Sequence, residues 1–171
     1  MTVCTALDWR RPRTWGGLQT DRRQKKDLWL SLVQEAAADH LIVRTSWMFG
    51  PAGENFVSTM LNLGANQNSL NIVNDQHGSP TYTRHLAKAI LTLFEKGARS
   101  IHHLTNSGSC TWLEFAKEIF RLGEVDVKVL PCSTEDYPTP ARRPKNSVLD
   151  CTGVQNPNVS SKHPCRLGRR P

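Results

Sequence analysis

Long apolar runs are missing from this sequence of 171 residues. No segment approaches the roughly 18 consecutive apolar residues that a membrane span needs, and the first residues lack the apolar segment of a secretion signal. The five cysteines form no CxxC pair, and an odd number in a chain without a signal favours reduced thiols over disulfides or a zinc site. We therefore expect a cytoplasmic protein that makes no membrane contact and binds no zinc.

Acidic residues are too few to balance the basic ones, but only at the two ends of the chain. The formal net charge is +7, yet residues 39–150 contain as many acidic as basic side chains, so the surplus lies in residues 1–38 and 151–171. Basic tails attract polyanions through counterion release. Neither end shows interleaved aromatic residues or a nucleic-acid-binding motif. We therefore expect no nucleic acid partner, and polyanion binding by the ends remains the lesser alternative.

The middle of the chain has the pattern of strands that alternate with helices. Residues 39–50 contain a continuous apolar run, typical of a strand that is covered on both faces. Shorter strands are predicted at residues 70–75, 100–106 and 125–133. Because helical patterns separate these strands, the sequence predicts an α/β fold with β-α-β connections.

The predicted helices have recognisable ends. Thr111 and Glu114 form a capping box, in which each side chain satisfies a backbone donor at the start of a helix. Gly64 is placed to cap the end of another helix. Helical spacing of apolar residues is found at residues 54–64, 83–97 and 111–123.

A glycine loop follows the first predicted strand of this middle region. Gly50 and Gly53 precede a predicted helix, an arrangement similar to the start of a dinucleotide-binding unit. The third glycine of Gly-x-Gly-x-x-Gly is missing, however, and Pro51 removes a backbone donor from the loop. We therefore interpret this stretch as something other than a phosphate-binding turn.

Four strings, in fixed order, resemble a known family. They are RTSWMFGPAGENFVSTML, NDQHGSPTYTRHLAKAI, IHHLTNSGSCTWLEFAKEIF and YPTPARRPKNSVLD. Together they resemble the C-terminal half of the dTDP-4-dehydrorhamnose reductases, which are extended short-chain dehydrogenase/reductases, and the likeness covers about residues 39–152. The resemblance implies an α/β fold with a partial Rossmann-like sheet, made of its late strands, plus a small C-terminal substrate-binding lobe.

The resemblance also implies a reaction. Family members use NADPH or NADH to reduce the 4-keto group of a dTDP-6-deoxyhexulose, giving dTDP-L-rhamnose, and a Tyr-x-x-x-Lys pair supplies the proton. Neither Tyr82 nor Tyr137 is followed by lysine at that spacing. The family spacing places the lysine at Lys26 and the tyrosine at Arg22, whose pKa is far too high for an acid. We therefore expect no catalytic pair and no activity from this chain alone. Some family members use magnesium, for which this sequence offers no recognisable ligand set.

The remaining implied site residues lie on the substrate side. Trp47 matches a family position that contacts the sugar nucleotide, and the alternative is a core tryptophan. Ser46 and Thr45 follow the strand, where they either bond to the substrate or the cofactor amide or simply close a turn. Asn55 is favoured as a helix cap over a ligand contact.

Two further segments are implied to lie near the ligand. The resemblance implies that Asp75 and Gln76 belong to a loop near the sugar. Formation of a turn explains these residues equally well. Arg143, with Arg142, either meets the diphosphate bidentately or anchors the C-terminal segment to an acidic neighbour.

These interpretations divide the chain into three parts. We expect residues 1–27 to be disordered or to come from a shifted reading frame, residues 28–151 to form the substrate-binding part, and residues 152–171 to be a disordered tail. The expected partners are a dTDP-sugar and either a second copy or a separate N-terminal half. The alternative function is that of a non-catalytic sugar-nucleotide-binding or regulatory protein similar to the beta subunit of methionine adenosyltransferase.

Overall fold

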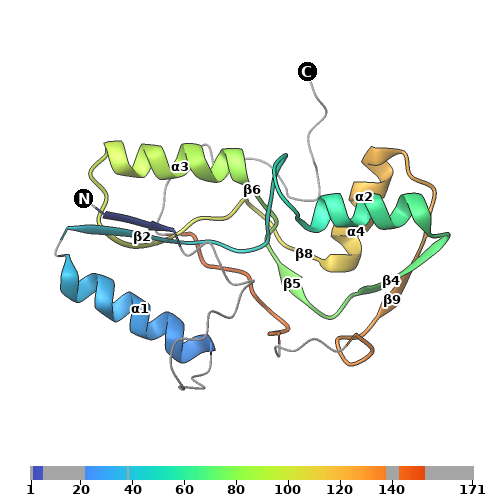
Figure 1. The fold of residues 1–171 in the computed structure, drawn as a ribbon, viewed down its shortest axis with the longest axis horizontal. Coiled ribbons are helices and arrows are strands. Elements are labelled where there is room, and N and C mark those ends of the chain that lie inside the picture. The colour runs from blue at the N-terminus through green and yellow to red at the C-terminus, as the bar shows by residue number, and fades with distance from the viewer. Residues whose placement is uncertain (1, 6–21, 38, 138–142, 153–171) are drawn as a thin grey trace.

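The computed structural model describes residues 2–5, 22–37, 39–137 and 143–152 (Figure 1). Its elements follow one another as strands and helices along the chain. In order they are β1 (Thr2–Thr5), α1 (Arg22–Ala36), β2 (His40–Arg44), β3 (Met48–Phe49), α2 (Phe56–Asn66), β4 (Ser69–Val73), β5 (His77–Gly78), β6 (Thr81–Tyr82), α3 (Thr83–Glu95), β7 (Ser100–His103), β8 (Cys110–Thr111), α4 (Trp112–Gly123) and β9 (Lys128–Cys132).

A three-stranded parallel sheet forms one part of the molecule. Its strand order is β1-β2-β7, with Val43 of β2 opposite His102 of β7. Leu41, Ile42 and Val43 of the central strand are all buried, which confirms the expectation of a strand covered on both faces. Figure 1 places α3 on one side of this sheet and α1 on the other. Leu86, Ala89 and Leu93 of α3 form a hydrophobic cluster with Leu41, Val43 and Leu104.

A second part holds the larger hydrophobic cluster. Strands β4 and β9 pair in parallel, and α2 and α4 pack beside them (Figure 1). Phe115 of α4 is only 1% exposed and contacts the rings of Phe49 and Phe56. The two parts match the predicted partial Rossmann-like sheet with a small additional lobe, and this prediction is confirmed.

The helix ends agree with the sequence in one case and differ in another. Thr111 and Glu114 form the predicted capping box of α4. Gly64, in contrast, does not end α2, because the helix continues to Asn66. A Cβ at Gly64 would lie 2.7 Å from Cε1 of Phe120. The glycine therefore allows α2 and α4 to approach closely, which is a requirement of packing and not of capping.

Two segments of residues 1–27, which the sequence predicted to be disordered or to come from a shifted reading frame, form regular elements. Thr2–Thr5 form β1 and α1 begins at Arg22. The strand forms because the edge of β2 offers backbone donors and acceptors that a parallel neighbour satisfies. Disorder was also predicted for residues 6–21 and 153–171. These residues lie outside the described ones.

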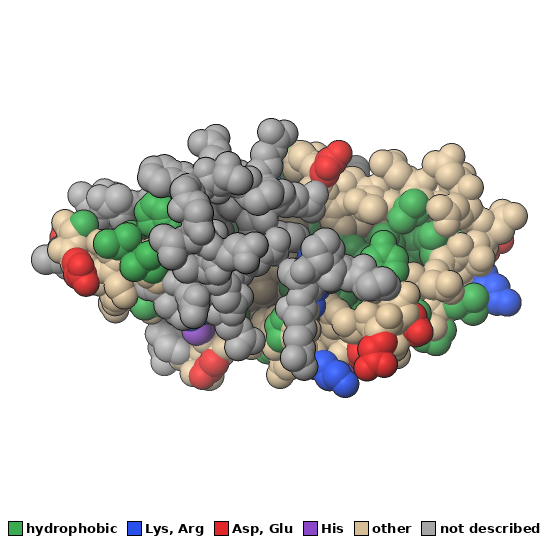
Figure 2. Space-filling model, turned by 60° about the horizontal axis from the view of Figure 1, so that its bottom comes forward, with side chains coloured by type: hydrophobic (Ala, Val, Ile, Leu, Met, Phe, Trp, Pro, Cys, Tyr) green, Lys and Arg blue, Asp and Glu red, His purple; other side chains and the backbone are tan. Residues whose placement is uncertain are grey.

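The surface of the described residues is mixed in character. On the face shown in Figure 2, the acidic and basic side chains are scattered among apolar and uncharged ones. Leu28, Trp29 and Leu32 of α1 are exposed, Trp29 by 67%. Among the described residues, no helix is both long and apolar enough to cross a membrane.

Candidate functional site

The site begins where β2 ends. Thr45 and Ser46 follow the strand, and the hydroxyl oxygens of both are buried without a hydrogen-bond partner among the described residues. Trp47 comes next with φ of 48°, the left-handed region that a bulky side chain rarely adopts. Such a strained backbone conformation is kept only where its surroundings determine it, and it is common at ligand sites. Polar side chains at the carboxyl end of a parallel strand are also where α/β sheets bind ligands.

The indole of Trp47 is held on several sides. Its ring stacks on Trp112 with ring centroids 3.5 Å apart and planes 6° apart. Its Nε1–H donates to Ser147 Oγ at 3.0 Å. A Cβ at Gly78 would overlap the same indole, so only glycine fits at that position. Trp47 is half-buried and packs against the larger cluster, so it combines a core contact with an accessible part.

Segments far apart in the sequence meet at this tryptophan. Ser147 lies 100 residues beyond Trp47 and uses its hydroxyl twice, accepting from the indole and donating to the carbonyl of His77 at 2.9 Å. Backbone bonds join the same segments, from His77 N to Lys145 O and from Ser147 N to His77 O. The fold thereby brings together three of the strings that carry the resemblance.

A chain of hydrogen bonds runs from Trp112 to Asp75. Trp112 Nε1–H donates to Gln76 Oε1 at 3.2 Å, and Gln76 Nε2 donates to Thr134 Oγ1 at 3.0 Å. Asp75 Oδ1 accepts from both the hydroxyl and the backbone N–H of Thr134, at 2.6 and 3.0 Å. Gln76 is buried. The amide of Gln76 is thus committed at both ends to other side chains.

The Asp75 carboxylate gives the site a pH dependence. The hydrogen bond from the Thr134 side chain lowers the pKa of Asp75 below its ordinary value of 3.8, and the Thr134 backbone N–H acts in the same direction. A lowered pKa means that the stabilisation is fully present above the ordinary value and is lost as the pH falls through the folded-state value. We expect Thr134→Val to raise the pKa of Asp75 toward 3.8, measured by NMR titration of the carboxyl carbon.

The same substitution at Thr92 is the control for this prediction. The hydroxyl of Thr92 donates to the Lys88 carbonyl within α3 and touches no carboxylate that the structure describes. Thr92→Val should therefore leave the pKa of Asp75 unchanged. An unchanged Asp75 titration in Thr134→Val as well would contradict the assigned cause.

Asn55 is a helix cap, as the sequence favoured. Its Oδ1 accepts from the backbone N–H groups of Val57 and Ser58. Its Nδ2 donates to the carbonyl oxygens of Gly50 and Gly53. These four bonds use the full capacity of a side-chain amide. The amide therefore organises the glycine loop and the start of α2.

This cap also tests the loop as a dinucleotide site. A phosphate-binding turn needs free backbone N–H groups at the helix start. Two of those at α2 are already bonded to Asn55. Two of the donors that a pyrophosphate would use are therefore already satisfied within the protein.

The remaining predicted residues are two arginines and a lysine. Arg143 is exposed, and Arg142 lies outside the described residues. Lys26 lies within α1, but its side chain is not among those described. Within the described part of the chain, no group of three or more histidine, cysteine and acidic residues is arranged to hold a metal ion.

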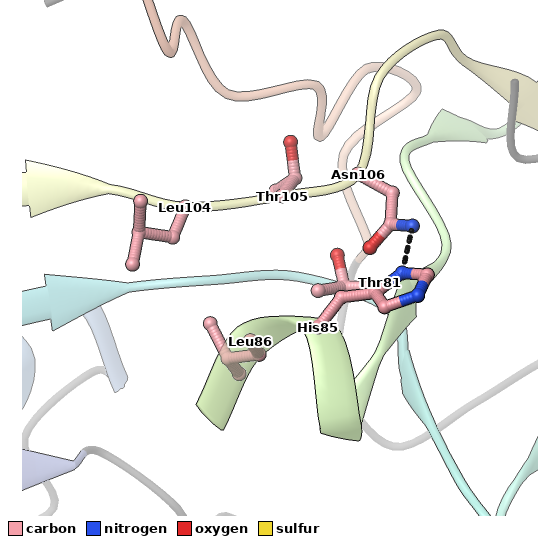
Figure 3. Close-up of a pocket in the computed structure, with 6 residues that line it drawn as sticks. All are labelled: Thr81, His85, Leu86, Leu104, Thr105 and Asn106. Carbon is pink, nitrogen blue, oxygen red and sulfur yellow. Dashed lines mark hydrogen bonds between the residues drawn. The ribbon is translucent and has the colours of Figure 1, made fainter. Parts of the chain in front are cut away.

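A small hollow at the carboxyl end of β7 was not predicted. Asn106 Oδ1 accepts from the backbone N–H of Tyr82 at 3.2 Å, and its amide nitrogen lies 3.0 Å from Nδ1 of His85. Figure 3 shows these two side chains turned toward each other. The available signal was the pair of polar residues, Thr105 and Asn106, at the end of the strand predicted at 100–106. The lining consists of Thr81, His85, Leu86, Leu104, Thr105 and Asn106.

The parallel sheet, its flanking helices and the polar groups at the end of β2 define a Rossmann-like α/β protein. A sequence profile described as "RmlD substrate binding domain" matches residues 26–166. The chain belongs to this family.

Individual relatives agree with the assignment. The spore coat polysaccharide biosynthesis protein SpsK of Bacillus subtilis is 39% identical over 140 residues, covering 82% of this chain and 49% of the relative. The dTDP-4-dehydrorhamnose reductase of Escherichia coli is 38% identical, covering 72% of this chain and 45% of the relative. The chain thus spans about half the length of these relatives.

A solved structure gives the same result. The dTDP-4-dehydrorhamnose reductase of Bacillus anthracis, crystallised in complex with NADP, superposes with a TM-score of 0.74 at 41% identity. The match covers 76% of this chain and 46% of that reductase.

Proposed function

We propose that this chain forms the sugar-nucleotide side of a dTDP-4-dehydrorhamnose reductase. The observation that carries the proposal is the indole of Trp47, fixed at the end of β2 next to Thr45 and Ser46, whose hydroxyls have no hydrogen-bond partner in the described part of the chain. The accessible part of this immobilised, half-buried ring suits the apolar side of a hexose or a thymine ring. The two hydroxyls supply donors and acceptors for its polar groups.

The proposed division of labour follows from what the sequence contains. The reduction needs a hydride from NADPH or NADH and an acid for the new hydroxyl. The chain has neither the glycine fingerprint nor the Tyr-x-x-x-Lys pair. By itself it binds the dTDP-sugar and does not reduce it. Catalysis then depends on groups that this sequence does not contain, and the proposed location of the protein is the cytoplasm.

We propose fewer residues in contact with the ligand than the sequence suggested. Trp47, Ser46 and Thr45 remain the groups that meet the ligand, and we assign the contact with its diphosphate to Arg143, which is exposed. Asn55 organises the loop from beneath. Residues 28–151 are the proposed substrate-binding part.

Thermal unfolding of the purified chain with and without dTDP-rhamnose tests the proposal. At a ligand concentration of 100 times Kd, binding stabilises the folded state by about 2.7 kcal/mol, which raises Tm by several degrees. The rise should disappear in Trp47→Ala and persist in Trp29→Ala, whose indole is exposed on α1. Comparing ligand-induced rises, and not absolute Tm values, separates binding from stability.

Two outcomes would contradict the proposal. An equal rise in Trp47→Ala would remove Trp47 from the site, and no rise in the unmodified chain would leave the dTDP-sugar without support as its ligand. If the unmodified chain shows no rise and selectively captures a methionine adenosyltransferase, a regulatory function would be favoured instead.

A further inference from the structure

The position of Trp47 depends on that of Trp112, which the sequence did not single out. Trp112 is the first residue of α4. The cap before it is tied to the loop after β4, because Thr111 Oγ1 accepts from Glu114 N at 3.1 Å and donates to Asn74 Oδ1 at 2.9 Å. The start of α4 is therefore fixed relative to the Asp75 loop, and the Trp112 ring provides a firm surface for Trp47.

The hydrogen bonds between Trp112 and Asp75 have a defined direction. The Thr134 hydroxyl has one proton, and at 2.6 Å from Asp75 Oδ1 that proton goes to the carboxylate. The hydroxyl oxygen then accepts from the Gln76 amide nitrogen. This leaves Gln76 Oε1 for the only donor of the Trp112 side chain. A flipped amide would break both of its bonds, so a charge at Asp75 fixes the orientation of Gln76.

This geometry turns Gln76 away from a direct ligand role. Gln76 is 7% exposed and both ends of its amide are bonded within the protein. Asp75 Oδ1 accepts two bonds from Thr134, whose hydroxyl also bonds to Gln76. Through these bonds the effect of Asp75 and Gln76 reaches the Trp112 ring, which stacks on Trp47.

We propose that Asp75, Thr134, Gln76 and Trp112 are positioning residues, which hold the Trp47 indole in the orientation that binds the dTDP-sugar. The inference rests on the proposed function for its ligand, but the orientation of the two indoles is observable without any ligand. The other edge of Trp47 is bonded to Ser147. Loss of a hydrogen bond among these four residues therefore tilts the Trp47 ring, while the bond to Ser147 keeps it in place.

The exciton couplet of the stacked indoles in the circular dichroism spectrum reports their mutual orientation. Trp112→Phe should abolish the couplet and thereby assign it to this pair. Thr134→Val removes the hydroxyl that links Asp75 to Gln76, two side chains away from Trp47. We expect it to reduce the couplet and to weaken dTDP-rhamnose binding about threefold to tenfold, the effect of losing one or two hydrogen bonds.

Two matched variants serve as controls. Thr134→Ser keeps the hydroxyl and should restore both the couplet and the affinity. Thr92→Val makes the same change as Thr134→Val on α3, away from the indoles, and should change neither. If Thr134→Val does not fold, Gln76→Met takes its place, because the thioether side chain has a similar shape and cannot donate to Thr134.

The possible results separate the two proposals. An unchanged couplet in Thr134→Val overturns the positioning role, and so does weaker binding with an unchanged couplet, since Asp75 or Gln76 would then act on the ligand directly. A reduced couplet with restored signal in Thr134→Ser supports the positioning of Trp47, even if the unmodified chain binds no dTDP-rhamnose. In that last case the proposed function alone fails.

Discussion

Replacing Phe115 by alanine is expected to lower the free energy of unfolding by about 3–5 kcal/mol, the usual cost of emptying a phenylalanine site in a core. Phe115 is 1% exposed and lies between the rings of Phe49 and Phe56, each with its centroid 5.4 Å away. The loss is a large part of the roughly 5–15 kcal/mol that stabilises most domains. Urea unfolding followed by circular dichroism measures it.

Phe94→Ala makes the same chemical change where burial is small. Phe94 lies near the end of α3 and is 42% exposed. Its replacement should cost well under half as much as that of Phe115, because less apolar surface returns to water and no closed cavity forms. Similar losses for the two variants would mean that the cluster around Phe115 is not the core that stabilises this part of the fold.

Gly78→Ala is expected to damage both stability and ligand binding. A Cβ at this position would overlap Cε2, Nε1 and Cδ2 of Trp47. The ring cannot retreat freely, since it is stacked on Trp112 and bonded to Ser147. Overpacking of this kind costs about 1–3 kcal/mol. We expect the indole to be displaced, so the ligand-induced rise in Tm should disappear.

A double-mutant cycle with Trp47→Ala isolates the cause. If the overlap with the indole is the reason for the loss, Gly78→Ala should cost clearly less free energy in the Trp47→Ala background than in the unmodified chain. Equal costs in both backgrounds would show that Gly78 is needed for another reason, such as the pairing of β5 with β8. Gly53→Ala is the comparison, because nothing lies within 4 Å of its added Cβ and only the positive φ of 74° opposes it.

The glycine loop illustrates how a local pattern can mislead. Gly50 and Gly53 between a buried strand and a helix suggested a cofactor turn, yet the Asn55 amide bonds to both of their carbonyl oxygens and to two N–H groups of α2. The incomplete fingerprint and Pro51 already argued against that function in the sequence. The closure of the loop by a single amide became visible only in three dimensions.

The sequence by itself determined the elements whose signals are local. The apolar run of β2, the capping box at Thr111 and the Asn55 cap depend on neighbours within a few residues, so spacing and side-chain chemistry predict them. The family resemblance rests on strings of the same kind, and it made Trp47 a candidate site residue.

Only the tertiary structure decided what surrounds Trp47. Its bond to Ser147 spans 100 residues and that of Gln76 to Thr134 spans 58, and no periodicity in the sequence specifies such pairs. Trp112 and Gly64 therefore gave no signal of their roles, although both lie at close contacts between elements. The physical reason is that these contacts arise from the packing of whole elements, in which each side chain's partner is set by register and crossing and not by its neighbours in sequence.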